Sequence, residues 1–278
     1  MTQLIDGKLV ASTIRGNIRA EVEAYKQSTG KEIGLAVVLV GDDPASAIYV
    51  RNKIKACEEV GIKSYAYKYD ADMKEEELVA LVERLNNDDD IHGILVQLPL
   101  PKHINEERIV ALVSEDKDVD GFSEKSIGRL VQGKPCFRSC TPYGVMKLLE
   151  YYGIEISGKN AVVIGRSNNV GKPMAMMLLE KNATVTICHS RTKNIAEITR
   201  QADILVSAVG RAHFVTADMV KEGAVVVDIG MNKLDGKTVG DVDFDAVSPK
   251  ASYITPVPGG VGPMTITMLM ANTLQAVK

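Results

Sequence analysis

The sequence lacks any apolar stretch of the length that a membrane span requires. A helix needs roughly 20 consecutive apolar residues to cross a bilayer, and no run in this chain of 278 residues approaches that length. The N-terminus also lacks the charged-then-apolar pattern of a secretory signal, because residues 1–6 are too polar. We therefore expect a cytoplasmic protein with no membrane partner.

A strong excess of basic residues is absent as well. Lys plus Arg total 33 against 36 Asp plus Glu, which gives a formal net charge of -3. A dedicated nucleic-acid binder needs a basic stripe, and we expect no nucleic-acid partner. The cysteines Cys57, Cys136, Cys140 and Cys188 lack the spacing of zinc ligands. The sequence thus predicts no metal site and free thiols in a reducing compartment.

Strand-like and helix-like segments alternate from Lys31 to Ile266, which favours an α/β fold with parallel sheets. The expected strands lie at residues 33–40, 64–69, 93–98, 161–164, 183–188, 204–209 and 224–229. The expected helices lie at residues 44–60, 74–85, 106–113, 143–152, 174–179 and 264–277. Residues 255–263 are expected to be irregular because they contain three prolines and three glycines.

A change in composition between Gly133 and Thr141 predicts a domain boundary. Glycine, proline and small polar residues cluster there, and Pro142 then starts a helix. We expect an N-terminal three-layer α/β domain of residues 1–138 and a Rossmann-like domain of residues 139–263, with a cleft between them.

Residues 161–173 are typical of a nucleotide site. Four apolar residues read as a buried strand, Gly165 ends it, and an apolar helix follows Pro173. Backbone N–H groups and the helix dipole converge at such a helix start and attract anions. Gly165 and Gly171 are six residues apart, which is not the usual G-x-G-x-x-G spacing. A plain turn between strand and helix is the alternative.

The end of the next strand indicates which nucleotide would bind. An Asp or Glu normally stands there and bonds the ribose 2′-hydroxyl of NAD, but this strand ends in His189, Ser190, Arg191 and Thr192. Hydroxyl and guanidinium groups suit a 2′-phosphate, and Arg166 can add a second cation. The sequence therefore favours NADP over NAD. The alternative is that Arg191 is an ordinary solvated arginine.

Tyr49 and Lys53 are candidates for proton transfer. They are four residues apart and so share one face of the helix 44–60. Both lie beside the apolar stripe of that helix rather than on it. In a partly dry cleft, desolvation would favour the neutral amine of Lys53, which can accept a proton. The alternative is an ordinary surface pair.

Three further features point to a ligand, each with an ordinary alternative. Gln97 is a polar residue at the carboxyl end of an apolar strand, where ligands of parallel sheets bind; it bonds a substrate or caps a loop. Asp120 can accept two parallel hydrogen bonds from a ring edge or form an Asx turn before Gly121. Residues 258–262 suit close approach to a flat ligand, or form a rigid linker.

Motifs along nearly the whole chain resemble those of the bifunctional methylenetetrahydrofolate dehydrogenase/methenyltetrahydrofolate cyclohydrolase family (the FolD family). They are Tyr49-Val-Arg-Asn-Lys53, Val96-Gln-Leu-Pro-Leu-Pro101, Lys117-Asp-Val-Asp-Gly-Phe122, Cys140-Thr-Pro142, Gly165-Arg-Ser167 with Val170-Gly-Lys-Pro173, His189-Ser-Arg-Thr192 and Pro256-Val-Pro-Gly-Gly-Val-Gly-Pro-Met-Thr265. Each motif alone is weak evidence, but their order and spacing are specific.

The resemblance implies two reactions in one-carbon metabolism and purine biosynthesis. These are NADP-dependent oxidation of 5,10-methylenetetrahydrofolate to 5,10-methenyltetrahydrofolate, and hydrolysis of that cation to 10-formyltetrahydrofolate. The implied catalytic residues are Lys53 as base or proton relay, Gln97 tuning it, Tyr49 near the pterin, and Asp120 holding the pterin. The implied folate contacts are Tyr49, Lys53, Val96, Gln97, Leu98, Asp120, Pro258, Gly259, Gly260, Val261 and Gly262. The implied NADP contacts are Gly165, Arg166, Ser167, Ser190, Arg191, Thr192 and Met231.

The resemblance also assigns roles to the predicted domains. Residues 1–138 are expected to bind folate, residues 139–263 to bind NADP, and the last helix, 264–278, to return to the first domain. The family usually forms homodimers through the second domain. Two other functions stay open, namely a dehydrogenase with little hydrolase activity and a catalytically silent NADP-binding regulator. The set of Tyr49, Lys53, Gln97 and Asp120 speaks against the regulator.

Overall fold

The computed structural model describes residues 2–278, except for the side chain of Ala45, and the chain forms two compact units. The three-stranded unit comprises Thr13–Arg138 and Ile266–Lys278. The six-stranded unit comprises residues 2–12 and Ser139–Thr265. Each unit contains a parallel sheet with helices, which confirms the predicted two-domain α/β class.

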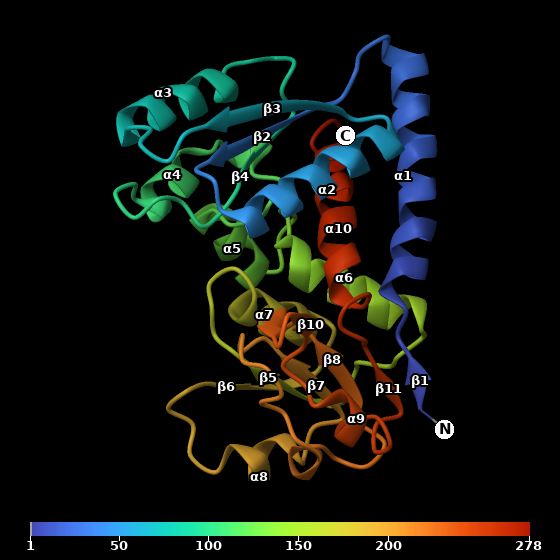
Figure 1. The fold of residues 1–278 in the computed structure, drawn as a ribbon. Coiled ribbons are helices and arrows are strands. Elements are labelled where there is room, and N and C mark those ends of the chain that lie inside the picture. Colours follow the sequence, from blue (N-terminus) through green and yellow to red (C-terminus); the bar gives the residue numbers. More distant parts are fainter. Residues whose placement is uncertain (1) are drawn as a thin grey trace. The chain divides into compact units, whose positions relative to one another are not determined.

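The three-stranded unit is built on a parallel sheet of order β3-β2-β4 (Figure 1). Its strands are β2 (Gly34–Val40), β3 (Lys63–Tyr69) and β4 (Gly93–Val96). Every residue of the central strand β2 is buried, as expected of a parallel strand covered on both faces. Alternate β2 residues (Ala36, Val38, Val40) join one hydrophobic cluster with α3 (Glu75–Asn86) and α4 (Glu106–Leu112).

The helix α2 (Pro44–Val60), which carries the candidates Tyr49 and Lys53, has the ends that its sequence predicts. The Asp43 carboxylate accepts a hydrogen bond from Ser46 N at 2.7 Å, and Pro44 occupies the first turn. Gly61 ends the helix in the left-handed conformation with φ of 82°, where glycine carries no Cβ penalty. The helix packs against β2 and β3.

Two helices of the first half were not predicted from the sequence. They are α1 (Gly7–Thr29) and α5 (Glu124–Val131). In α1, Gly16 weakens the helical pattern because glycine has low helix propensity. The missed signal is Asp6, whose carboxylate accepts hydrogen bonds from Lys8 N at 2.9 Å and Leu9 N at 3.1 Å. An acidic residue capping the first turn is a helix start signal.

The six-stranded unit is a parallel sheet of order β1-β11-β8-β7-β5-β6. Its strands are β1 (Gln3–Leu4), β5 (Asn160–Ile164), β6 (Thr184–Cys188), β7 (Ile204–Ser207), β8 (Val225–Asp228) and β11 (Tyr253–Ile254). A hairpin of β9 (Asn232–Leu234) and β10 (Lys237–Val239) follows β8. The helices are α6 (Cys140–Tyr151), α7 (Gly171–Glu180), α8 (Ile195–Thr199), α9 (Phe244–Val247) and the start of α10 (Val261–Gln275).

Several boundaries differ from those expected. Residues 2–12 belong to the six-stranded unit, because β1 pairs with β11, and not to the first domain. Helix α7 begins at Gly171 rather than beyond Pro173. Helix α10 begins at Val261, so the expectation of irregular structure holds for residues 255–260 and is wrong for 261–263. Pro263 fits the first turn of α10 because its missing N–H would have no helical partner there.

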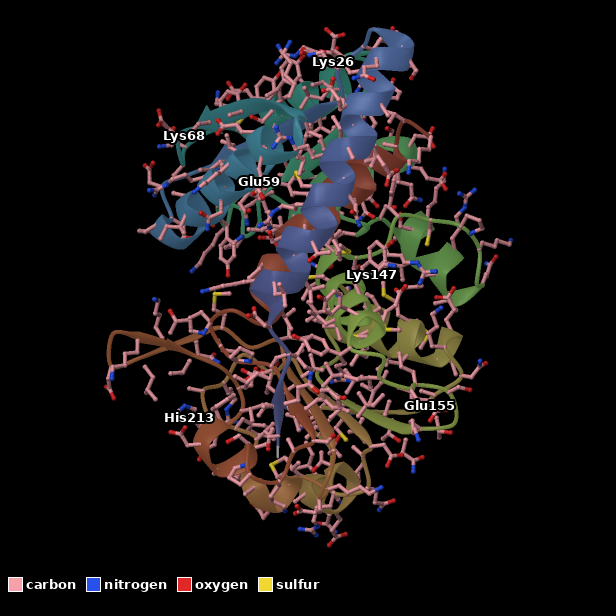
Figure 2. All side chains as sticks on the ribbon, turned by 90° about the vertical axis from the view of Figure 1, so that its right-hand side faces the viewer. Lys26, Glu59, Lys68, Lys147, Glu155 and His213 are labelled. Carbon is pink, nitrogen blue, oxygen red and sulfur yellow. The ribbon has the colours of Figure 1, made fainter. Side chains whose placement is uncertain are left out.

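Charged side chains of both signs alternate over the surface of the three-stranded unit. Lys26 lies 3.1 Å from Glu32, Glu59 lies 3.0 Å from Arg15, and Lys68 lies 3.6 Å from Asp42. Figure 2 shows Lys26, Glu59 and Lys68 on α1, α2 and β3 respectively. Exposed pairs of this kind add little stability, and they reflect the balanced composition.

Two buried carboxylates hold the loops that leave β7 and β8. Asp228, which is 3% exposed, accepts hydrogen bonds from Gly230 N, Asp241 N and Val242 N. Asp241 in turn accepts from the backbone N–H groups of Val209, Gly210 and Arg211 and from the side chains of Ser207 and Asn232. Burial raises the pKa of Asp228 to about 6, and the nearby Asp241 acts in the same direction.

We expect the pKa of Asp228 to make the protein less stable as pH rises from about 4 to about 6. The folded state holds this proton more tightly than the unfolded state, whose Asp pKa is about 3.9, so unfolding becomes easier as the proton is lost. Relative to Asp228→Asn, the wild type should lose about 2 kcal/mol of unfolding free energy across this window. Urea unfolding at several pH values measures this difference, and parallel pH profiles for the two proteins would contradict it.

Candidate functional site

Lys53 and Gln97 are the candidate catalytic residues that the structure brings into direct contact. Nζ of Lys53 donates a hydrogen bond to Oε1 of Gln97 at 3.0 Å, although the two residues are 44 positions apart. Lys53 is 9% exposed, and none of the ion pairs among the described residues 2–278 includes it. The amine of Lys53 is therefore held in a mostly buried position by a neutral amide oxygen.

Gln97 is fixed by its own backbone and side chain. Its N–H donates to Val38 O at 2.8 Å, which continues the pairing of β4 with β2 by one residue. Its amide Nε2 donates to Leu98 O at 2.6 Å. The two roles predicted for Gln97, capping a loop and binding a substrate, do not exclude each other. Its Nε2 binds the adjacent loop, while its Oε1 faces Lys53.

The other candidates of this region occupy different environments. Tyr49 is half-buried one helical turn before Lys53, and desolvation raises the pKa of its phenol. Val96 is buried in the hydrophobic cluster of this unit, and the half-buried Leu98 packs against that cluster. A ligand would therefore meet the backbone of Val96 rather than its side chain. Asp120 is half-buried in the loop that follows the 3-10 helix Glu115–Lys117.

The segment Pro258–Gly262 is part of the six-stranded unit. Gly259 has φ of 110°, and a Cβ on Gly260 would lie 2.6 Å from Pro256 O. A Cβ on Gly7 would lie 1.7 Å from Gly260 O, so this segment packs closely on the start of α1. Met231 is a neighbour, because its methyl carbon lies 3.5 Å from the place of a Cβ on Gly262.

A pocket of about 330 Å³ lies at the carboxyl ends of β5, β6 and β7. Gly165 forms part of its wall with φ of 130°, and a Cβ there would lie 2.4 Å from Ala208 O. Its lining residues are Ile164, Gly165, Arg166, His189, Ser190, Ile195, Ala208, Val209, Arg211 and Phe214. Two arginines, a serine and a histidine among apolar residues suit an anionic group joined to a flat ring.

The pocket brings together only some of the residues predicted for the cofactor. Gly165, Arg166 and Ser190 line it, whereas Ser167, Arg191, Thr192 and Met231 are not among its lining residues. The Ser167 hydroxyl accepts a hydrogen bond from Gly171 N at 3.3 Å at the start of α7. The Thr192 hydroxyl accepts from His189 N at 2.9 Å and so shapes the turn after β6.

Arg211 and Phe214 are among the pocket residues that were not predicted from the sequence. The Arg211 guanidinium lies 5.1 Å from the centre of the Phe214 ring, and Arg211 N donates to Asp241. The signal was available, because residues 210–214 follow the carboxyl end of an apolar strand, where ligands bind.

Within residues 2–278, no helix is long and apolar enough to span a bilayer. Over the same residues, no group of three or more His, Cys, Asp or Glu side chains is arranged to hold a metal ion. The four cysteines are free thiols, and burial raises the pKa of Cys57 to about 12.

Two family descriptions match this chain. "Tetrahydrofolate dehydrogenase/cyclohydrolase, catalytic domain" matches residues 5–120, and "Tetrahydrofolate dehydrogenase/cyclohydrolase, NAD(P)-binding domain" matches residues 139–278. The chain belongs to this family. The resemblance inferred from its motifs is confirmed, and the pocket beside Gly165 lies in the NAD(P)-binding domain.

Individual relatives of the family agree over nearly the full length. A bifunctional FolD protein of Acidovorax ebreus (strain TPSY) is 61% identical over 276 residues, which is 99% of this chain and 98% of that protein. The solved structure of bifunctional FolD from Campylobacter jejuni has a TM-score of 0.97 and 52% identity, covering 99% of this chain and 98% of that chain. A Trypanosoma brucei dehydrogenase-cyclohydrolase, solved with NADP and an inhibitor, has a TM-score of 0.95 and 39% identity, with coverage of 99% and 97%.

We expect Gly165→Ala to weaken NADP binding roughly tenfold or more, because strain of 1–3 kcal/mol at this φ would displace the pocket wall. Isothermal titration with NADP measures the loss. Gly153→Ala is the matched control, since Gly153 has φ of 63° in the same unit but no heavy atom lies within 4 Å of its Cβ position. Equal NADP affinity in folded Gly165→Ala and Gly153→Ala would refute the close contact.

Proposed function

We propose that this chain catalyses two consecutive reactions on a folate. It oxidises 5,10-methylenetetrahydrofolate to 5,10-methenyltetrahydrofolate with NADP+, and it hydrolyses the methenyl product to 10-formyltetrahydrofolate. Membership of the family over both units supports the pair of reactions. The observation that carries the hydrolysis is the hydrogen bond between Lys53 and Gln97, because it holds a proton acceptor in a fixed place.

For the oxidation, bound NADP supplies the acceptor of the hydride. We assign its binding to Gly165, Arg166, Ser167, Ser190, Arg191, Thr192 and Met231. Arg166 and Ser190 line the pocket and would bind the 2′-phosphate. The Trypanosoma brucei relative was solved with NADP, which supports this nucleotide rather than NAD.

For the folate, we assign recognition of the pterin to Asp120 and Tyr49. The Asp120 carboxylate can accept two parallel hydrogen bonds from the ring edge, and the half-buried Tyr49 ring can pack against the ring face. Val96 would contribute main-chain contacts, because its side chain lies in the hydrophobic cluster, and the half-buried Leu98 would contact the folate beside it. The backbone of Pro258, Gly259, Gly260, Val261 and Gly262 would complete the folate contacts.

For the hydrolysis, we assign proton transfer to Lys53. Water attacks the cationic methenyl carbon, and the neutral Lys53 amine accepts a proton from that water. The amine can then deliver that proton to the ring nitrogen as its bond to this carbon breaks, while the hydroxyl on the carbon loses its proton to solvent and becomes the formyl carbonyl. Gln97 orients Nζ through its Oε1 atom, 3.0 Å away.

We further propose that the enzyme acts in the cytoplasm as a homodimer formed through the NADP-binding unit. Its formyl product would serve one-carbon transfer, including purine biosynthesis. The usual assembly of the family supports the dimer. A dehydrogenase with little hydrolase activity is the second candidate, and the Lys53–Gln97 contact weighs against it.

We expect Lys53→Met to reduce hydrolysis of methenyltetrahydrofolate by about 100-fold or more, because general base catalysis contributes 10²–10⁴-fold. Absorbance of the methenyl cation follows the reaction, and the affinity for NADP should stay unchanged. Lys55→Met is the matched control, since Lys55 is an exposed lysine on the same helix. Undiminished hydrolysis in Lys53→Met would remove the role that we assign to Lys53.

We expect Arg166→Ala and Arg191→Ala to weaken NADP more than NAD, because each removes a cation proposed to bind the 2′-phosphate. A charged hydrogen bond is worth about 1.5–3 kcal/mol, or roughly 10- to 100-fold in affinity. Arg166, which lines the pocket, should show the larger change. Arg200→Ala is the control, because its Nη1 donates to Asp218 O away from the pocket. Equal losses for the two nucleotides would place phosphate recognition elsewhere.

A further inference from the structure

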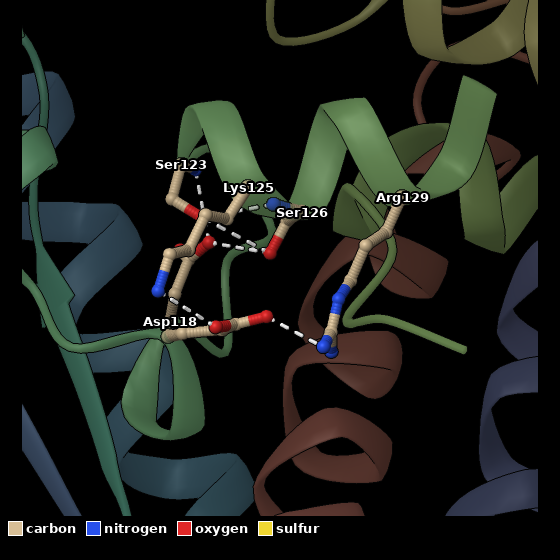
Figure 3. Close-up of polar contacts among 6 residues, drawn as sticks. Asp118, Ser123, Lys125, Ser126 and Arg129 are labelled. Carbon is tan, nitrogen blue, oxygen red and sulfur yellow. Dashed lines mark hydrogen bonds and ion pairs between the residues drawn. The ribbon is translucent and has the colours of Figure 1, made fainter. Parts of the chain in front are cut away.

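Asp118 is a buried carboxylate next to the folate-binding candidate Asp120. It is 4% exposed, and both of its oxygens accept hydrogen bonds. Oδ1 accepts from Phe122 N at 3.1 Å, and Oδ2 accepts from Ser123 N at 2.9 Å and from the Ser126 hydroxyl at 2.9 Å. Figure 3 shows Asp118, Ser123 and Ser126 converging at the start of α5. A carboxylate engaged in this way is unsuited to bind a ligand itself.

The backbone is held on both sides of Asp120. On one side, Val119 is buried, its N–H donates to Lys117 O at 2.9 Å, and its carbonyl accepts from Asn272 Nδ2 of α10 at 2.7 Å. On the other side, Gly121 N donates to Asp118 O at 3.0 Å, and Gly121 has φ of 70°. The turn therefore closes around Asp120 and leaves that residue half-buried.

The turn is also anchored at both ends. Nζ of Lys117 donates to Leu85 O at 3.0 Å and Asp88 O at 2.7 Å, at the end of α3. Beyond the turn, Asp118 and Ser123 bind the start of α5 (Figure 3). Glu115 pairs with Lys125 at 3.0 Å in the first turn of α5 and with Arg129 at 2.9 Å in its last turn.

From this arrangement we propose that Asp118 is a positioning residue for Asp120. It fixes the turn that aims the Asp120 carboxylate at the pterin, and this proposal rests on the folate role assigned to Asp120. A carboxylate that accepts two parallel hydrogen bonds must keep its direction, and an error of about 1 Å in placement can cost about 100-fold in rate. Asp118 supplies that constraint because its carboxylate binds two backbone N–H groups that follow Asp120, those of Phe122 and Ser123. The same carboxylate binds the hydroxyl of Ser126 in α5.

Asp118→Asn tests this role. An amide keeps the shape of the side chain but replaces one acceptor oxygen by a donor, so either Phe122 N or Ser123 N loses its partner. We expect the KM for methylenetetrahydrofolate to rise about tenfold or more, with the Kd for NADP changed less than about twofold, within the scatter of distant effects. Asn105→Ala is the matched control, because Asn105 caps α4 by accepting from Arg108 N at 3.1 Å elsewhere in the unit. It should lower Tm with no change in the folate KM.

A double-mutant cycle with Asp120→Asn separates positioning from general loss of stability. If Asp118 acts through Asp120, the double variant should have the folate KM of Asp120→Asn alone. Additive effects on KM, or an unchanged KM in Asp118→Asn while Asp120→Asn is impaired, would overturn the positioning role only. A normal folate KM in Asp120→Asn would overturn both this proposal and the folate contact on which it rests.

Discussion

Parallel pairing of strands is the constraint on which both candidate sites depend. In a parallel sheet, all carboxyl ends lie at one edge, so residues from distant parts of the chain meet there. β2 pairs with β4 in the register Val38–Val96. Gln97 therefore lies just beyond the end of β4, at the edge of the sheet where the chain passes from β2 to α2. Its Oε1 atom lies 3.0 Å from Nζ of Lys53. In the six-stranded unit, the ends of β5, β6 and β7 form the pocket beside Gly165 in the same way.

Buried carboxylates provide the second level of organisation, because they fix the loops that leave the strands and helices. Asp241 binds three consecutive N–H groups, those of Val209, Gly210 and Arg211, and Asp228 binds the N–H of Asp241 itself. Asp118 does the same in the turn that carries Asp120. Loops have few backbone partners of their own, so such acceptors give a loop the rigidity that a binding site needs.

Much of the fold followed from local patterns. The bounds of α2 at residues 44 and 60 were predicted from the sequence and found as expected. Buried strands such as β2 and β8 were recognisable as short apolar runs. Helix α1 was missed because Gly16 interrupts its pattern, and the pairing of β1 with β11 was missed because strands of two residues carry no periodicity. For the sites, the motifs named the family, but they did not separate the roles of Asp118 and Asp120.

The sequence by itself determined the α/β class, the alternation of elements, the chemistry available and the family, because these depend on residue type and order. Only the tertiary structure decided which polar groups meet. It placed Lys53 against Gln97, put Arg211 and Phe214 on the pocket beside Gly165, and turned Asp118 inward among backbone donors. The reason is that such contacts join residues far apart in the chain, and strand register and helix packing, rather than local propensity, set the distances between them.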